Sequence, residues 1–199
     1  MKSVAIVGLG WLGLPLAQHL KKLGWRVKGS KQSLADAQRL HRLGIEAYPF
    51  SFSEKMNSLP DNIQSLFDVD ALIITLPPSS FSSQQYCEHL AFLANQAKKK
   101  GVQHLIFTSS TSVFPDISGQ FDESSQPSAE TEIGKTLIKA EQCLFQSEIS
   151  LIYPSNGGNT AANKYPPDWA KPEISAASLS FLDFTENKYI TYENDPPPA

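Results

Sequence analysis

Three spaced glycines near the start of the chain constrain its fold more than any other feature. Gly8, Gly10 and Gly13 follow the apolar, β-branched run Val4–Val7 in the spacing GxGxxG, and apolar residues at helical spacing come next. In a strand–loop–helix unit these glycines permit a tight turn, a close approach of backbone to a pyrophosphate, and close helix–strand packing. The alternative interpretation is a glycine turn that packs the helix against the strand and binds no ligand. The predicted dinucleotide-binding residues of this loop are Gly8, Leu9, Gly10, Trp11, Leu12 and Gly13.

Strand-like and helix-like segments alternate through most of the chain. After Val4–Val7, strands are expected at Trp25–Gly29, Ile45–Phe50, Asp70–Leu76, Val102–Thr108 and Ile149–Tyr153. Helices are expected at residues 11–23, 34–43, 83–100 and 131–146. This alternation requires right-handed crossovers and therefore a parallel sheet. The predicted class is α/β, a Rossmann doubly wound parallel sheet with a reduced, truncated C-terminal lobe.

The character of the sequence changes near Gly158. Seven of the fourteen prolines lie in residues 154–199, no glycine occurs after Gly158, and clear periodicity is lost. We expect an NAD(P)-binding domain at residues 1–157. Residues 158–199 are expected to form a shortened substrate-lobe remnant or a tail.

Composition excludes several classes of protein. The 199 residues carry a net charge of −3, so no overall basic field favours nucleic acid as a partner. No apolar stretch approaches the length of a membrane span, and the first apolar run ends in glycines instead of a cleavage site. Cys87 and Cys143 lack metal-ligand or CxxC spacing, and the four histidines also lack ligand spacing. We expect an uncleaved, reduced, cytoplasmic chain with no metal site.

The end of the second expected strand bears on the choice of cofactor. A carboxylate usually stands there when NAD is preferred, because it accepts hydrogen bonds from the ribose hydroxyls. This chain has Ser30 and Lys31 instead, a small hydroxyl and a cation that suit a 2′-phosphate. We therefore expect NADP(H) over NAD(H), with Lys31 as an ordinary solvated lysine being the alternative.

Two further strand ends are expected at the same rim of the sheet, where ligands of open parallel sheets bind. Leu76 and Pro77 end the fourth strand, where an adenine or ribose would pass. Five hydroxyl residues, Thr108–Ser112, follow the fifth strand beside the expected nicotinamide position. Loop polarity and helix capping are the alternative explanation of these hydroxyls.

These segments together resemble the short-chain dehydrogenase/reductase superfamily on its extended or atypical side, the NAD-dependent epimerase/dehydratase group, and within it the bacterial YeeZ-type proteins. The resemblance covers residues 1 to about 155. It is carried by residues 4–13, 24–31, 71–77 and 106–114.

The resemblance implies roles for several residues. Ser110 matches the hydroxyl that hydrogen-bonds the reacting oxygen, and Ser109 falls among the cofactor contacts. Thr111 and Asn156 are implied substrate contacts. The Tyr-x-x-x-Lys pair of the family, however, aligns with Ile133 and Leu137, and neither side chain can move a proton. The nearby residues Lys135 and Lys139 point away from that helical face.

Two interpretations of function therefore stay open. One is an NADP(H)-dependent oxidoreductase or an epimerase/dehydratase-like enzyme that acts on a small molecule without the usual Tyr/Lys pair. The other is a non-catalytic dinucleotide-binding sensor or a degenerate paralogue. We do not expect a β-hydroxyacid-dehydrogenase-like reductase, because that class needs a large helical second domain, for which 199 residues leave no room. The apolar helices at 83–100 and 131–146 are also compatible with a homodimer.

Overall fold

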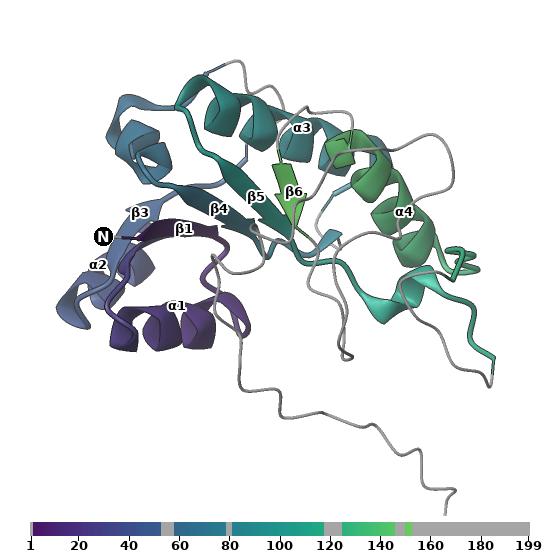
Figure 1. Ribbon diagram of the computed structural model, residues 1–199, viewed down its shortest axis with the longest axis horizontal. Helices are drawn as coiled ribbons and strands as arrows, with labels where there is room; N and C mark the ends of the chain where they lie inside the picture. The colour runs from purple at the N-terminus through teal and green to yellow at the C-terminus, as the bar shows by residue number, and fades with distance from the viewer. Residues whose placement is uncertain (1, 53–57, 79–80, 118–124, 146–149, 153–199) are drawn as a thin grey trace, which may run out of the picture.

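The computed structural model describes residues 2–52, 58–78, 81–117, 125–145 and 150–152. Within these residues, six parallel strands form one sheet in the order β3-β2-β1-β4-β5-β6 (Figure 1). The strands are β1 Ser3–Val7, β2 Arg26–Lys31, β3 Glu46–Pro49, β4 Ala71–Ile74, β5 His104–Phe107 and β6 Ser150–Ile152. This order reverses at β1, as in dinucleotide-binding Rossmann sheets, and it confirms the predicted doubly wound parallel sheet.

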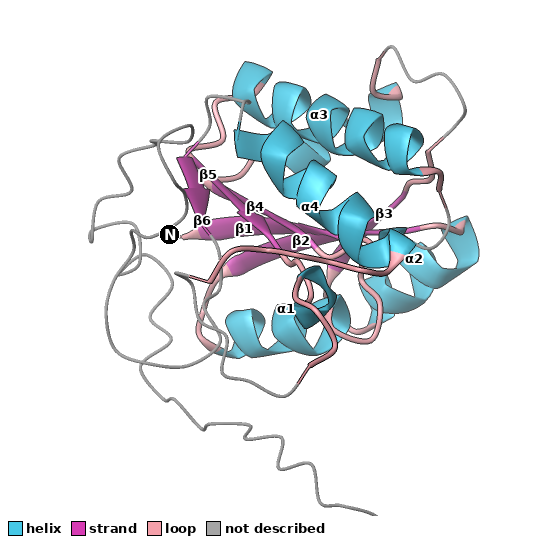
Figure 2. Ribbon diagram, turned by 90° about the vertical axis from the view of Figure 1, so that its right-hand side faces the viewer, coloured by secondary structure: helices cyan, strands magenta, loops and turns pink. Residues whose placement is uncertain are grey.

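Helices cover both faces of the sheet (Figure 2). The α-helices are α1 Gly13–Lys22, α2 Leu34–Arg42, α3 Ser83–Lys99 and α4 Glu132–Phe145, and the 3-10 helices include η1 Asp61–Phe67 and η3 Thr111–Val113. Helices α1 and α2 lie on one face, and α3 and α4 lie side by side on the other. None of the described helices combines the length and the apolar character that a membrane-spanning helix needs.

The central strand β1 shows why the apolar run near the start is continuous. All four residues of Val4–Val7 are fully buried. Ala5 and Val7 belong to the core under α3 and α4, whereas Val4 and Ile6 belong to the core under α1 and α2. Alternate side chains of a strand point to opposite faces, so a strand covered on both sides needs an unbroken apolar sequence. The burial expected from the sequence is confirmed.

Strand β2 runs two residues further than predicted and includes Ser30 and Lys31. Gly29 lies inside the strand and not at its end. Its missing side chain makes room for that of Leu9. A Cβ at this position would lie 2.5 Å from Cδ1 of Leu9. The Leu9 amide also donates to the Ser30 carbonyl over 2.9 Å, which joins the glycine loop to the end of β2.

Other expectations differ from the structure at their edges. The first helix was predicted to include Trp11 and Leu12, but α1 begins at Gly13 and Trp11 is 90% exposed. Apolar spacing predicted that helix start wrongly, because Trp11 contributes to the loop and not to the core. Helix η1 was not predicted. The domain boundary expected at residue 157 and the segment 158–199 lie outside the described residues.

Candidate functional site

The glycine loop between β1 and α1 is held by contacts that leave no room for side chains. Gly8 has a φ of +107°, and a Cβ on it would lie 2.9 Å from Oγ1 of Thr75. A Cβ on Gly13 would lie only 2.2 Å from the Gly8 carbonyl oxygen. Thr75 Oγ1 donates to that same oxygen over 2.6 Å, so the end of β4 supports the loop from below. The first and third glycines are therefore required by the fold itself.

The outer side of the same loop is open. A Cβ on Gly10 would meet nothing within 4 Å, and Gly10 is exposed. Among the described residues, the amides of Trp11 and Leu12 donate no backbone hydrogen bond. These amides belong to the start of α1, where unpaired N–H groups and the helix dipole favour an anion. The loop therefore fits the pyrophosphate of a dinucleotide.

Ser30 lies beneath the loop instead of facing the rim. It is 3% exposed, and its Oγ accepts a hydrogen bond from the Gly8 amide over 3.1 Å. This contact, together with the Leu9 bond to the Ser30 carbonyl, fixes the loop to β2. Lys31 follows at the end of the strand and is half-buried. Ser30 and Lys31 were both predicted to contact a 2′-phosphate. The Ser30 side chain bonds to the glycine loop, whereas these contacts do not involve the Lys31 side chain.

The end of β4 brings Leu76 to the glycine loop. Cδ2 of Leu76 would lie 3.2 Å from a Cβ on Gly8, and the Leu76 carbonyl accepts a hydrogen bond from the Tyr86 hydroxyl over 2.6 Å. Tyr86 is fully buried in α3, and burial raises the pKa of its phenol above its ordinary range. This phenol is therefore a structural anchor of the strand end. Pro77 is exposed next to it.

The hydroxyl segment after β5 divides into exposed and buried members. Ser110 and Thr111 are exposed. Ser110 Oγ accepts hydrogen bonds from the Ser112 amide and hydroxyl, at 3.3 and 3.1 Å, and so caps η3. The capping role considered from the sequence is therefore present in the fold. An exposed hydroxyl that accepts these bonds still has its own proton to donate.

Ser109 turns the other way, toward α4. Its hydroxyl oxygen is buried and has no partner of normal hydrogen-bond geometry among the described residues. It interacts with the carboxyl group of Glu141 on α4. Burial raises the pKa of this carboxyl, and the contact with Ser109 offsets part of that rise. The hydroxyl of Ser109, a predicted cofactor contact, thus lies between the segment after β5 and α4.

Helix α4 approaches the hydroxyl segment closely through Gly134. A Cβ at this position would lie 2.1 Å from the carbonyl oxygen of Ser112 and 2.5 Å from Cβ of Ala129. The missing side chain therefore sets the distance between the first turn of α4 and η3. This close packing holds the start of α4 near the rim of the sheet, where Ile133 and Thr136 line a cleft.

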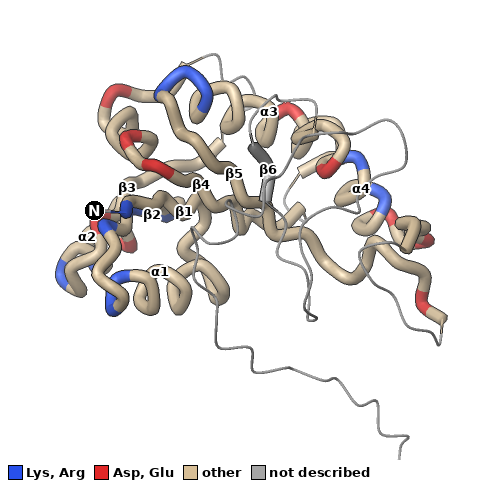
Figure 3. Tube along the Cα trace, in the orientation of Figure 1, with Lys and Arg blue, Asp and Glu red and all other residues tan. Residues whose placement is uncertain are grey.

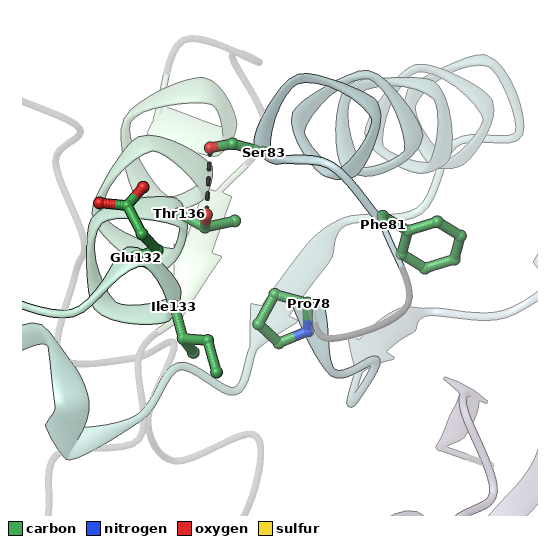
Figure 4. Close-up of a pocket in the computed structure, with 6 residues that line it drawn as sticks. All are labelled: Pro78, Phe81, Ser83, Glu132, Ile133 and Thr136. Carbon is green, nitrogen blue, oxygen red and sulfur yellow. Dashed lines mark hydrogen bonds between the residues drawn. The ribbon is translucent and has the colours of Figure 1, made fainter.

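A cleft of about 320 Å³ opens between the first turns of α3 and α4, next to the end of β4 (Figure 4). Ser83 and Thr136 face each other across it, with their hydroxyl oxygens 3.1 Å apart. Its lining residues are Pro78, Phe81, Ser83, Glu132, Ile133 and Thr136. Three of the lining residues are apolar, and the other three contribute two hydroxyl groups and one carboxylate.

The two α4 positions aligned with the family's Tyr/Lys pair have different surroundings. Ile133 is 52% exposed and lines the cleft, whereas Leu137 is 3% exposed and lies in the core. Lys135 lies on the exposed side of α4, where its ammonium pairs with Glu132 over 2.9 Å. A hydrogen bond from Lys135 lowers the pKa of the Glu132 carboxyl, which makes that carboxylate a weak base.

The cations of α1 and α2 lie away from this rim. They gather in the last turn of each helix, at the end opposite the glycine loop (Figure 3). They complement the helix dipoles there. No three His, Cys, Asp or Glu side chains in the described ranges are arranged to hold a metal ion. Asn156, an implied substrate contact, lies outside the described residues.

Comparison with known proteins identifies relatives of the chain. No protein-family model matches it. The YeeZ protein of Escherichia coli strain K12 is 38% identical over 146 residues, which cover 72% of this chain and 53% of YeeZ, and YeeZ of Escherichia coli O157:H7 matches equally. The chain is related to the YeeZ proteins. It spans about half the length of the curated relatives it matches.

Solved structures show which fold the chain shares. A putative NAD-dependent epimerase/dehydratase from Methylobacillus flagellatus is 25% identical, with a TM-score of 0.58 over 76% of this chain and 52% of that one. The UDP-glucuronic acid 4-epimerase of Bacillus cereus, in complex with NAD, is 17% identical, with a TM-score of 0.61 over 76% and 54%. A short-chain dehydrogenase/reductase superfamily protein from Agrobacterium tumefaciens is 16% identical, with a TM-score of 0.56 over 76% of this chain and 48% of that one, and it shares the same fold. These findings confirm the resemblance drawn from the sequence.

The sequence did not predict the internal contacts of Ser30 and Ser109. Both were expected at the rim because each follows or ends a strand of the sheet. The direction in which a side chain at a strand end points depends on where the strand ends. The predicted end of β2, Gly29, was two residues before the observed end, Lys31. For Glu141 a signal was available. It lies four residues after Leu137 and eight after Ile133, on the helical face that borders the sheet.

Proposed function

We propose that the chain binds NADP(H) at the glycine loop, as the cofactor-binding part of a short-chain dehydrogenase/reductase-type protein. The open backbone at Gly10, above the unpaired amides of Trp11 and Leu12, carries this proposal. The complex of the Bacillus cereus epimerase with NAD supports it, because the two chains share the fold. The proposed binding domain covers residues 1–157.

The proposed preference for NADP(H) depends on Lys31. No carboxylate ends β2, and the Ser30 hydroxyl is occupied by the Gly8 amide. The ammonium group of Lys31 is therefore the proposed partner of the 2′-phosphate. A lysine can supply such a charge-assisted bond without fixed geometry.

When bound, the dinucleotide would supply or accept a hydride. The exposed hydroxyl of Ser110 and the adjacent Thr111 are proposed to bind the reacting oxygen of a small-molecule substrate. Proton transfer by a phenol–lysine pair has no counterpart at Ile133 and Leu137. An oxidoreductase or epimerase/dehydratase-like reaction must therefore use another proton donor. The exposed Ile133 and buried Leu137 also favour a second candidate, a dinucleotide-binding protein without catalytic activity.

Titration of the full chain with NADPH and NADH tests the cofactor proposal. Fluorescence of Trp11, 90% exposed in the loop, is the expected signal, and Trp11→Phe should remove it. Replacing Lys31 by Ala should weaken NADPH binding about tenfold or more and leave NADH binding unchanged, since one charge-assisted bond is lost. Lys22→Ala, a matched loss of charge in the last turn of α1, should change neither. Equal affinities for both cofactors that Lys31→Ala leaves unchanged would contradict the preference.

A further inference from the structure

The only two cysteines of the chain lie on two helices that pack against each other. Cys87 belongs to α3 and Cys143 to α4, and both are half-buried. The two helices run side by side on one face of the sheet (Figure 2) and are joined at their first turns by Ser83 and Thr136. Cys87 follows Ser83 by one helical turn, and Cys143 follows Thr136 by about two turns.

This spacing of nearly whole turns from the bonded pair Ser83 and Thr136 puts both cysteines on the helix faces that meet. The Cys143 thiol is close enough to act on the ionisation of the Cys87 thiol. Burial, and then the Cys143 thiol, raises the pKa of Cys87 to about 12. Lys139 and Glu88 are the charged groups that act on Cys87, the first favouring its thiolate and the second opposing it. With no third metal ligand in the described part of the chain, the pair does not form a metal site.

We propose that Cys87 and Cys143 are a redox-sensitive thiol pair that a small disulfide of the glutathione class converts to an interhelical disulfide. One thiolate attacks a sulfur of the oxidant, forms a mixed disulfide and releases one glutathione thiolate. The second cysteine then attacks the bound sulfur and releases the other. The pair loses two protons and two electrons, and the disulfide of the oxidant is reduced to two thiols.

Geometry favours the second step over a stable mixed disulfide. The resolving thiol lies on the facing side of the neighbouring helix, whereas a bound glutathione must fit between two packed helices. The raised pKa of Cys87 keeps its thiolate scarce at neutral pH, so the first step is slow and becomes faster as the pH rises. The product would tie together the two helices that border the cleft. This proposal does not depend on cofactor binding.

Intact-mass spectrometry of the full chain incubated with oxidised glutathione at pH 8.5 tests the proposal. We expect a loss of about 2 Da, a peptide linking Cys87 to Cys143, and full reversal by dithiothreitol. Cys87→Ser and Cys143→Ser should each gain one glutathione and no internal link. The same treatment of unfolded wild-type chain confirms that both thiols are free to react.

Two results would contradict the proposed redox role of Cys87 and Cys143. One is glutathione retained on both cysteines of the folded chain without a cross-link. The other is an unchanged mass of the folded chain under conditions in which the unfolded chain reacts. Either result would assign the two cysteines to packing alone, the usual role of buried free cysteines.

Discussion

The β1–α1–β2 region and the β5–η3–α4 region border the same rim, and each is closed by a glycine that admits no side chain. In the first, Gly13 packs against the Gly8 carbonyl, and in the second, Gly134 packs against the Ser112 carbonyl. The first region presents open backbone amides around Gly10. The second presents the aliphatic Ile133, with Leu137 buried behind it.

This difference separates two kinds of chemistry. Phosphate binding at a helix start uses backbone groups, which any sequence that folds this way supplies. Proton transfer requires particular side chains at particular positions. The second region has Ile133 and Leu137 at the positions where the family resemblance implies a phenol and a lysine. We therefore expect dinucleotide binding and proton transfer to be separable properties of this fold.

The largest effect is expected from Gly13→Ala. Its Cβ would lie 2.2 Å from the Gly8 carbonyl oxygen, so α1 or the loop must move. The free energy of unfolding should fall by about 3 kcal/mol or more, as for severe overpacking. Urea unfolding measures the loss. Gly10→Ala, with open space around its Cβ, is the matched control and should change stability by less than about 0.5 kcal/mol. Equal stabilities of the two variants would contradict the packing described for the loop.

Gly134→Ala should have a smaller effect on stability. The new Cβ meets the Ser112 carbonyl at 2.1 Å, but alanine in a helix regains about 1 kcal/mol of helix propensity. We expect a net loss of about 2 kcal/mol in urea unfolding, with Lys135→Ala as an exposed control on the same turn. NADPH affinity should stay unchanged, because the glycine loop belongs to the other region. A loss of affinity as large as that of loop variants would show that the two regions are coupled.

The sequence predicted the first region better than the second for a physical reason. Steric limits on Gly8 and Gly13 act within a few residues, so their spacing alone indicates the loop. The contacts of Ser109 and Cys87 with α4 join residues far apart in the chain. No local pattern encodes them, because they depend on how α4 lies across β5 and α3. The parallel sheet also followed from the alternation of strands and helices, whereas the end of β2 depended on the packing of Leu9 over Gly29.

The smallest effect is expected from Glu141→Gln, which probes the second region. Burial raises the pKa of Glu141 above its ordinary value of 4.5, so the folded chain holds this proton more tightly than the unfolded chain. Stability should therefore fall as pH rises from 4.5 through the folded pKa, and glutamine cannot titrate. The variant should gain stability over wild type toward neutral pH, with the gain vanishing below pH 4.5. Thermal unfolding from pH 4 to 8 measures it, and a pH-independent difference would argue against a buried carboxyl.

Calorimetric titration of NADPH into wild type and Gly10→Val tests the central claim most directly. The claim is that the open backbone at Gly10 is the dinucleotide site, and a valine there would extend into this space from a Cβ that meets nothing within 4 Å. We predict micromolar binding by wild type and at least about tenfold weaker binding by the variant, with the same urea midpoint for both. Equal NADPH affinity of the two proteins, or no binding by wild type, would contradict it.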